Sequence, residues 1–524
     1  MTKYLLRRIL HGLISILIVV GIIMVMIYSM LDRNLVFASD PVYTKVANNQ
    51  KTTYKYRKWQ EFGYIDFINY ADYIRQLADR GEIDEETRAK AVAFGKTPDG
   101  DSDLAAEYVA KFEDYCAQNG YTTVRLNAVM ATPKKYVTGG QQQYFAYKDR
   151  PLAMRLWKYF SGMITVDTIH SVQEDVGERK LTYTLHDPVY GGKKFSPAIL
   201  GNGTTHKYLL YCDNRFPYVH QNLVTLNLGL SYSVNPGIDV TTTMNRAQGS
   251  YVPSPVLYPT GLEEVSADDL HSAVYSSGSL ETNAVLKDRF LDNYTNVQTV
   301  KSGHSRIGYS FIIGIIATVL AYLLGLPLGL WMALKKDKLV DKIGTAYIVF
   351  IMAVPSLAYI LIFKAIGGKA LNLPTVFDME TTSKLIYVLP IVSLMLPTVA
   401  SLMRWLRRYM IDQMNSDYVK FARSGGLSES EIFFKHIMKN AIIPIVYGIP
   451  GSILVAMTGA FITERVYIVP GIGGLLINAI SAYDNGVIVG VTLFYATISV
   501  VSAILGDVLM AMTDPRISFT SKAR

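Results

Sequence analysis

The chain alternates between long apolar runs and polar segments, as membrane proteins do. A helix needs about 20 predominantly apolar residues to cross a bilayer. Six runs come close to or exceed that length, at residues 9–31, 307–334, 343–366, 385–403, 441–462 and 487–512. The pattern predicts an all-α polytopic membrane protein with six transmembrane helices.

The first apolar run has a second interpretation, a cleaved signal peptide with its cleavage site at 36–38. Its apolar core is longer than the usual core of a signal peptide, and the site lies well beyond the end of that core. We therefore expect residues 1–31 to form a short N-terminus and an uncleaved first transmembrane helix.

The segment 32–305 contains no run that could span a membrane, and it holds most of the 36 tyrosines. Apolar spacing at the helical period predicts helices over 70–78, 82–94 and 101–118. Alternation together with high β-propensity predicts strands over 121–126, 181–185 and 207–212. We expect a large α+β domain inserted between the first and second transmembrane helices.

Basic residues orient the chain in the membrane. The net charge is +8, and Lys and Arg gather beside apolar runs at the N-terminus, at 335–338 and at 404–440. Because cytoplasmic loops carry the excess of positive charge, these segments and both termini are expected in the cytoplasm. The insert 32–305 is then extracytoplasmic, and 306–524 holds helices two to six. The same clustering argues against nucleic-acid binding.

The polar, basic segment 404–440 carries helix signals of its own. Ser416 and Asp417 are N-cap residues, so a short helix is predicted to begin there. Gly425 and Gly426 end that helix, because glycine accepts the left-handed conformation that follows a helix end.

A second helix is predicted to follow the glycines. Ser428 and Glu431 form a capping box at its start. The helix then places apolar side chains on one face, at Ile432, Phe433, Ile437 and Ala441. Helix, glycine turn and helix together predict a compact elbow at the membrane surface, and we call residues 404–440 the elbow.

Motifs for catalysis are missing from the sequence. Gly95-Lys96-Thr97 resembles the end of a phosphate-binding loop, but Lys90 stands where that loop requires glycine. His-Glu-x-x-His, Cys-x-x-Cys and Gly-x-Ser-x-Gly do not occur. We expect no catalytic centre, no metal and no cofactor in this chain, so any energy source must belong to a partner.

Three residues of the sequence have two interpretations each. Cys116 and Cys212 both lie in the insert, where they form either a disulfide or two free thiols. Asp507 lies inside the last apolar run, where a carboxyl group is costly. Asp507 either makes a structural hydrogen bond between helices or takes part in the transport of protons or substrate.

The elbow resembles the cytoplasmic coupling loop, or EAA loop, of ABC importer permeases of the peptide and nickel group. That loop has an acidic-Tyr-Val sequence, an Ala-Arg pair, a key glycine, Leu-Ser-Glu and a closing Ile-x-Pro. The matching positions are Asp417-Tyr418-Val419, Ala422-Arg423, Gly426-Leu427-Ser428-Glu429, His436, Asn440-Ala441 and Pro444. Gly425 departs from the pattern, because the residue before the key glycine is usually basic.

Parts of the insert resemble the same family. Residues 151–160 are similar to the stretch that follows its first helix. Residues 226–231 are similar to its Gly-Asp-Leu-Gly-x-Ser element, with departures at Leu226 and Asn227. Residues 205–222 resemble the Ami-type oligopeptide permeases of Gram-positive bacteria.

Two segments near the C-terminus complete the resemblance. Glu464 with Pro470-Gly471-Ile472-Gly473 is similar to the external re-entrant segment of the family. Asp514-Pro515-Arg516 is similar to its closing motif.

The resemblance implies one of two unlike membrane subunits of an oligopeptide ABC importer that works by alternating access. The implied partners are a second permease subunit in a heterodimer, two ATPase subunits that bind ATP and Mg²⁺, and an extracellular peptide-binding lipoprotein. ATPase coupling falls to Asp417, Tyr418, Ala422, Arg423, Gly426, Leu427, Ser428 and Glu431. Gating or structural roles fall to Glu464, Pro470 and Gly471, and to Asp507 as the acid within a span.

Two other classes of protein share some of these sequence features. A proton- or ion-coupled carrier would use Asp507 and transport without an ATPase, but it gives no reason for the elbow. A membrane-anchored receptor or sensor would need only one or two spans, so the six apolar runs argue against it.

Overall fold

The structure is a computed structural model. It describes residues 2–92, 103–126, 130–132, 135–136, 143–166, 180–186, 193, 195–201, 208–212, 217–219, 224–253, 255–257, 263–265, 273–276, 296–379 and 383–513. Three segments named from the sequence, 95–97, 514–516 and parts of 205–222, lie outside the described residues.

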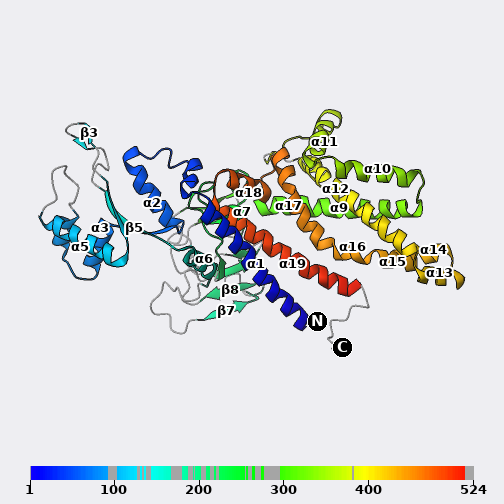
Figure 1. The fold of residues 1–524 in the computed structure, drawn as a ribbon, viewed down its shortest axis with the longest axis horizontal. Helices are drawn as coiled ribbons and strands as arrows, with labels where there is room; N and C mark the ends of the chain where they lie inside the picture. The colour runs from blue at the N-terminus through cyan, green and yellow to red at the C-terminus, as the bar shows by residue number, and fades with distance from the viewer. Residues whose placement is uncertain are drawn as a thin grey trace.

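Within the described residues, four helices are long and apolar enough to cross a membrane by themselves. They are α1 (Thr2–Met30), α9 (Arg306–Leu334), α12 (Val388–Met414) with the short helix η5 (Lys384–Tyr387) before it, and α19 (Asn485–Thr513). In Figure 1, α1 and α19 run side by side, and α9 packs against α12. These four helices match four of the six predicted runs.

The third apolar run is not one continuous helix, which corrects the sequence prediction for 343–366. It forms α10 (Leu339–Ala353) and α11 (Ser356–Ala370), bent by 113°. Pro355 lies at the break, where it disfavours helical geometry in Val354 and brings no backbone N–H of its own. The apolar residues of the sequence reveal the run but not the angle between its two halves.

The fifth apolar run is part of a longer helical stretch with several breaks. Its pieces are α14 (Glu429–Glu431), the π-helix η6 (Ile432–Ile437), α15 (Met438–Ala441), α16 (Ile443–Tyr447) and α17 (Ile449–Tyr467). The bend before α17 is 42°, and Pro444 and Pro450 lie at the first turns of α16 and α17. The described chain thus has four spans, or up to six if each bent pair is one span.

The insert contains both helices and sheets, as predicted. A three-stranded antiparallel sheet has the order β1 (Ile65–Asn69), β5 (Gln143–Asp149), β2 (Thr122–Leu126). Its helices are α2 (Lys51–Glu61), α3 (Tyr70–Asp79), α4 (Glu85–Ala91) and α5 (Asp103–Asn119), with the short helices η1 (Arg33–Ser39) and η2 (Asn48–Gln50) before them. The three predicted helices correspond to α3, α4 and α5. Aromatic side chains such as Tyr73, Phe112 and Tyr144 fill the core between α3, α5 and the sheet.

Further small antiparallel sheets complete the described part of the insert. Four strands lie in the order β10 (Pro217–Val219), β9 (Tyr208–Cys212), β8 (Ala198–Gly201), β7 (Leu181–Thr184). The other pairings join β6 (Ile164–Val166) with β11 (Val224–Leu226), β16 (Asn296–Lys301) with β12 (Tyr251–Pro253) and β15 (Ala273–Ser276), β13 (Pro255–Leu257) with β14 (Glu263–Val265), and β3 (Met130–Thr132) with β4 (Lys135–Tyr136). Helices α6 (Leu152–Ser161) and α7 (Val240–Asn245) lie among them. The three predicted strands correspond to β2, β7 and β9.

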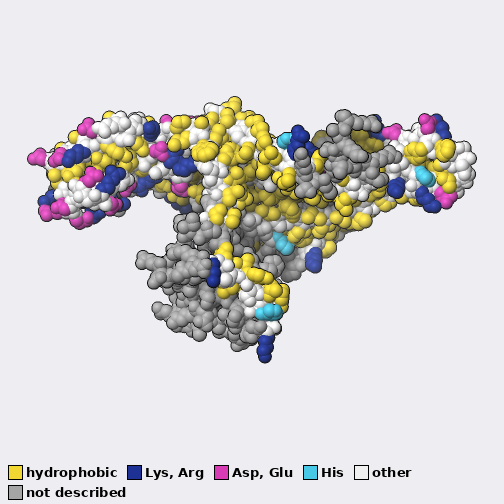
Figure 2. Space-filling view, turned by 90° about the horizontal axis from the view of Figure 1, so that it is seen from below, with side chains coloured by type: hydrophobic (Ala, Val, Ile, Leu, Met, Phe, Trp, Pro, Cys, Tyr) yellow, Lys and Arg dark blue, Asp and Glu magenta, His cyan; other side chains and the backbone are white. Residues whose placement is uncertain are grey.

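Side-chain chemistry divides the long molecule into three zones. Figure 2 shows charged side chains gathered at both ends of the long axis and hydrophobic ones over the middle. One charged end is the domain of α3 and α5, and the other is the tip that carries α13 (Asp417–Ser424) and α14. The middle exposes large apolar side chains such as Leu13 and Leu323, as a lipid-facing surface requires.

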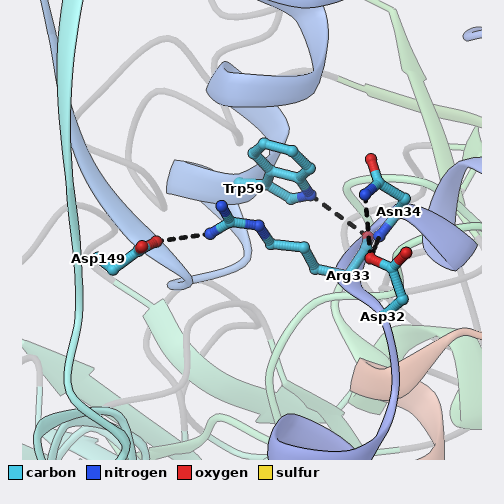
Figure 3. Close-up of polar contacts among 5 residues, drawn as sticks. All are labelled: Asp32, Arg33, Asn34, Trp59 and Asp149. Atoms are coloured by element: carbon cyan, nitrogen blue, oxygen red, sulfur yellow. Dashed lines mark hydrogen bonds and ion pairs between the residues drawn. The ribbon is translucent and has the colours of Figure 1, made fainter. Parts of the chain in front are cut away.

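A small polar cluster joins the C-terminal end of α1 to the insert (Figure 3). Asp32 accepts a hydrogen bond from the backbone N–H of Asn34 at 2.9 Å and so caps η1. Arg33 forms an ion pair with Asp149 of β5 at 2.6 Å, and its guanidinium lies 4.2 Å from the centre of the Trp59 ring. The indole of Trp59 donates to the Arg33 carbonyl at 3.3 Å. These contacts fix α2 and β5 to the first turn after the membrane helix.

A buried carboxylate makes a second junction, between the insert and α19. Asp484 lies just before α19 and is completely buried. Its oxygens accept hydrogen bonds from the Ser231 hydroxyl (2.6 Å) and from the backbone N–H groups of Tyr232 (2.8 Å), Ser233 (3.0 Å), Val234 (2.9 Å) and Val487 (3.1 Å). Ser231 ends the element 226–231, so this element is held against the start of the last helix.

The two cysteines do not form a pair in the described structure. Cys116 is a free thiol in the buried core of the insert, and the side chain of Cys212 lies outside the described residues. Burial raises the pKa of the Cys116 thiol to about 11, which keeps it protonated and unreactive near neutral pH.

We predict that Asp484→Ala lowers the free energy of unfolding by about 3 kcal/mol or more, because several buried donors lose their acceptor. The measurements are thermal unfolding in detergent and, in a separate experiment, limited proteolysis of the insert. Asp412→Ala is the matched control, since the Asp412 side chain is 63% exposed. Equal stability of the two variants would contradict the proposed junction.

We also predict that a maleimide leaves Cys116 unlabelled in the folded protein at pH 7.5, because fewer than about one thiol in a thousand is ionised at a pKa near 11. Unfolding without reductant should expose both thiols to the reagent. Labelling only after reduction would instead reveal a disulfide with Cys212.

Candidate coupling site

The first arm of the elbow is α13, and its start differs in detail from the prediction. Ser416 occupies the N-cap position, but its hydroxyl donates to the carbonyl of Gln413 at 2.6 Å and makes no cap hydrogen bond. The reason is that α12 ends at Met414, so the last turn of α12 offers a carbonyl nearby. Asp417 forms an ion pair with Lys420 at 2.9 Å, on the exposed side of the arm.

The turn between the arms is the glycine turn that the sequence predicts. Gly425 ends α13 with a right-handed backbone, and Gly426 has φ +83°. The backbone N–H of Gly426 donates to the carbonyl of Arg423 at 3.1 Å, and that of Leu427 donates to the carbonyl of Ala422 at 3.3 Å. A Cβ added at Gly426 would meet open space. Only the left-handed backbone therefore requires glycine there.

The second arm begins with the predicted capping box. The Ser428 hydroxyl accepts from the backbone N–H of Glu431 at 3.3 Å, and the Glu431 carboxylate accepts from the backbone N–H of Ser428 at 3.3 Å. Across the turn, Arg423 reaches Glu429 with two nitrogens, at 2.6 and 3.0 Å. This forked ion pair joins the two arms, although both side chains are more than half exposed and its stabilisation is small.

The inner face of the elbow packs on the end of α12. Val419, Ile432, Phe433, Ile437 and Ala441 are all buried in one core with Leu406 and Met410 of α12, which confirms the predicted apolar face of the second arm. Tyr418 adds a polar link, because its hydroxyl donates to Gln413 at 2.9 Å. The elbow is thus an attachment of α12 rather than a loose loop.

The outer face of the elbow exposes the coupling candidate Leu427 and two aromatic side chains, Phe421 and Phe434, that the sequence did not single out. Phe421 is 80% exposed, and Leu427 and Phe434 are exposed as well. Phe421 lies about 200° around the helix axis from the buried Val419, which is the signal that could have identified it. Lys420, Arg423 and Lys435 surround this face with positive charge, each beside an acidic partner.

Next to the elbow, a buried ion pair fixes α10 to α12. Arg407 donates to both oxygens of Asp341, at 2.5 and 2.6 Å, and Asp341 is 3% exposed. The carboxylate also accepts from the backbone N–H of Asp337 at 2.9 Å. This pair was not predicted from the sequence, where the acidic residue Asp341 in the first turn of α10 is the only local signal.

At the opposite side of the bundle, the predicted residues Glu464, Pro470 and Gly471 come together. Glu464 is almost fully buried and accepts from the Ser310 hydroxyl of α9 at 2.6 Å and from the backbone N–H of Gly474 at 2.8 Å. Pro470 and Gly471 form the turn into α18 (Ile472–Ser481). A Cβ at Gly471 would collide with the Glu464 carboxylate, so this glycine permits the close approach.

Asp507 lies apart from both groups and links the first and last helices. Its carboxylate forms an ion pair with Arg8 at 2.7 Å and accepts from the Tyr4 hydroxyl at 3.1 Å. The interaction is therefore a hydrogen-bonded contact between α1 and α19. The described residues contain no group of His, Cys, Asp and Glu that could hold a metal ion.

Comparison with known proteins places the chain in a family. The family model for the "binding-protein-dependent transport system inner membrane component" matches residues 325–519. The oligopeptide transport system permease protein AmiC of Streptococcus pneumoniae is 34% identical, over 100% of this chain and 99% of that protein. The dipeptide transport system permease protein DppB of Bacillus subtilis is 31% identical, over 41% of this chain and 68% of that protein.

A crystal structure of an amino acid ABC transporter is also similar, with a TM-score of 0.32 and 15% identity over 40% of this chain and 92% of that chain. A TM-score at this level does not establish a common fold. The full-length match to AmiC does establish the relationship. The chain belongs to the family of binding-protein-dependent transport-system inner-membrane components, and it is a membrane-spanning permease subunit of an ATP-driven importer.

Proposed function

We propose that this permease imports oligopeptides as one of two unlike membrane subunits. The single observation that carries the substrate class is the full-length similarity to an oligopeptide permease, which includes the insert. The mode of transport is alternating access, in which the bundle opens in turn to each side of the membrane. The proton-coupled carrier is not favoured, because its candidate group Asp507 is occupied by Arg8 and Tyr4.

The proposed topology has six spans with both termini in the cytoplasm. Residues 1–31 form the N-terminus and first span, 32–305 the extracytoplasmic domain, and 306–524 the remaining five spans with the cytoplasmic elbow 404–440. Two features support this arrangement: the positive charge of the elbow, and its position at the far end of the long axis from the domain of α3 and α5 (Figure 1).

The elbow is proposed to be the contact site of the ATPase subunits. ATP with Mg²⁺, the energy source, is proposed to bind to those partner subunits and not to this chain. An exposed aromatic residue with a rim of charged side chains suits a protein interface, and Phe421 has that setting. Because the inner face packs on α12, a push on the outer face reaches that helix directly. The shape of the elbow is maintained by the turn at Gly426, by the capping box of Ser428 and Glu431, and by the ion pair of Arg423 with Glu429.

The complete set of proposed partners is a second permease subunit, two ATPase subunits and an extracellular lipoprotein that delivers peptide. The insert is proposed to dock this lipoprotein or to cover the entrance, since tyrosine-rich surfaces suit protein contacts. Such a role requires a fixed position above the bundle, and the Asp484 and Arg33 junctions would provide one.

We predict that Phe421→Asp abolishes co-purification of the ATPases and ATP-driven peptide import while the chain still inserts and folds, because a central aromatic contact is worth on the order of 2 kcal/mol or more. Phe195→Asp is the matched control, since Phe195 is 72% exposed but lies in the insert. A wild-type chain that purifies without an ATPase and still moves peptide along a proton gradient would overturn the proposed function.

We predict different effects for the two neighbouring glycines. Gly426→Ala places a side chain at φ +83° and should cost the turn about 1–2 kcal/mol, which would reduce ATP-driven import. Gly425→Ala keeps a right-handed φ of −76° and brings its Cβ only into ordinary contact, 3.4 Å from the Ala422 carbonyl, so import should be unchanged. Import assays on both variants test this, and an equal loss would contradict the assigned turn.

A further inference from the structure

A cavity of about 910 Å³ lies where the insert meets the outer ends of α1 and α19. Its wall includes Tyr28 of α1, Arg57 of α2, Arg155 and Lys158 of α6, and Gly486 at the start of α19. We call it the junction cavity. Its volume falls in the range of small-molecule sites, about 300–1,000 Å³, and neither the elbow nor the Glu464 turn contributes to it.

The charges that line the junction cavity are unbalanced. The acids Glu61 and Asp72 in its wall are already paired, with Lys58 at 2.7 Å and Arg75 at 3.4 Å. Four cations also line it, and within the described residues only one of them, Arg150, has an ion-pair partner, Asp66. No ion pair among the described residues offsets the positive charge of Arg57, Arg155 and Lys158, so this wall can attract a negatively charged group.

The Arg155 guanidinium is held by two aromatic rings, but one of its nitrogens makes no hydrogen bond to the described residues. The guanidinium lies 3.6 Å from the centre of the Tyr28 ring and 4.0 Å from that of Tyr64, so two cation–π contacts orient it. The Nη2 atom is buried and has no hydrogen-bond partner among the described residues. A buried donor without an acceptor costs free energy, so it calls for a bound group that accepts a hydrogen bond. A carboxylate is such a group, because it can accept two parallel hydrogen bonds from a guanidinium.

The remaining wall of the junction cavity suits a peptide. The side-chain amides of Gln60, Asn69 and Asn227 offer both donors and acceptors, as the backbone of a peptide requires. The stacked rings of Phe62 and Tyr232, 3.8 Å between centroids, form an apolar surface for its side chains. We propose that the junction cavity binds a short peptide in transit and that Arg155, supported by Lys158 and Arg57, receives its C-terminal carboxylate.

This proposal rests on the proposed function, and it adds a binding step between the delivering protein and the helical bundle. The cavity touches α1, α19 and the insert at once, so a peptide held there would lie at the outer entrance of the bundle. Selection by the permease would then favour peptides with a free C-terminus over amidated ones, in addition to any selection by the delivering protein.

The test measures ATP-driven import into vesicles by the complete complex, with radiolabelled tetra-alanine as the free acid and as the C-terminal amide. Arg155→Gln should lower import of subsaturating acid about tenfold, the value of a charge-assisted hydrogen bond, and leave import of the amide nearly unchanged. Lys158→Gln should change the acid-to-amide ratio in the same direction by less, because Lys158 is exposed. Arg80→Gln, on an exposed arginine of the same domain, should not change the ratio.

Each other outcome has a defined meaning. If wild type imports neither peptide with ATP, the proposed function itself fails. If wild type imports peptide but Arg155→Gln and Lys158→Gln leave the acid-to-amide ratio unchanged, the cavity proposal fails while the function stands. If Arg155→Gln affects both peptides equally, and only in vesicles that contain an anionic phospholipid, the cavity holds a lipid headgroup and the proposal is overturned. Thermal unfolding of each variant separates these effects from misfolding.

Discussion

A carboxylate that is buried away from water must be surrounded by hydrogen-bond donors, and Asp484 has five of them. Four of the five belong to residues 231–234, about 200 residues into the insert 32–305, and the fifth belongs to α19. The same carboxylate therefore starts the last helix and fixes the insert to it. Without this contact, the junction cavity would lose the relative position of its walls, because Gly486 and Tyr232 line it from the two sides of Asp484.

The elbow depends on a different principle, the division of one short helix into two faces. Val419 faces the core shared with α12, whereas Phe421 faces outward. Such a surface can be firmly attached and still offer a contact to another protein, since its stability does not depend on the exposed side. The ion pair of Arg423 with Glu429 lies on the exposed side, where it joins the two arms without being part of the core.

Local signals in the sequence predicted local structure well. The capping box of Ser428 and Glu431, the left-handed glycine at 426 and the apolar face of the second arm are each decided by residues within a few positions of one another. The bend of 113° at Pro355 was harder, because apolar content indicates that a run enters the membrane but not how its two halves are directed. Asp484 could be identified as a helix cap, but its partners at 231–234 could not, since about 250 residues separate them and no local pattern encodes that pairing. For the same reason, the orphaned nitrogen of Arg155 becomes visible only in three dimensions.

The two ends of the bundle are connected through the packing of α9 on α12. A Cβ at Gly325 would lie 2.9 Å from the Cβ of Leu402, and one at Gly329 would lie 3.1 Å from the Cα of Met403, so these glycines let the two helices approach closely. At one end of this contact, α12 supports the elbow through Leu406 and Met410. At the other end, α9 carries Ser310, which donates to Glu464 and accepts from the backbone N–H of Ile472 at 2.9 Å. A close-packed seam resists separate tilting of its helices, because tilting would open voids along the whole contact. A displacement of the elbow would therefore move α9 and α12 as one body and reach the turn at Pro470 through Ser310 and Glu464.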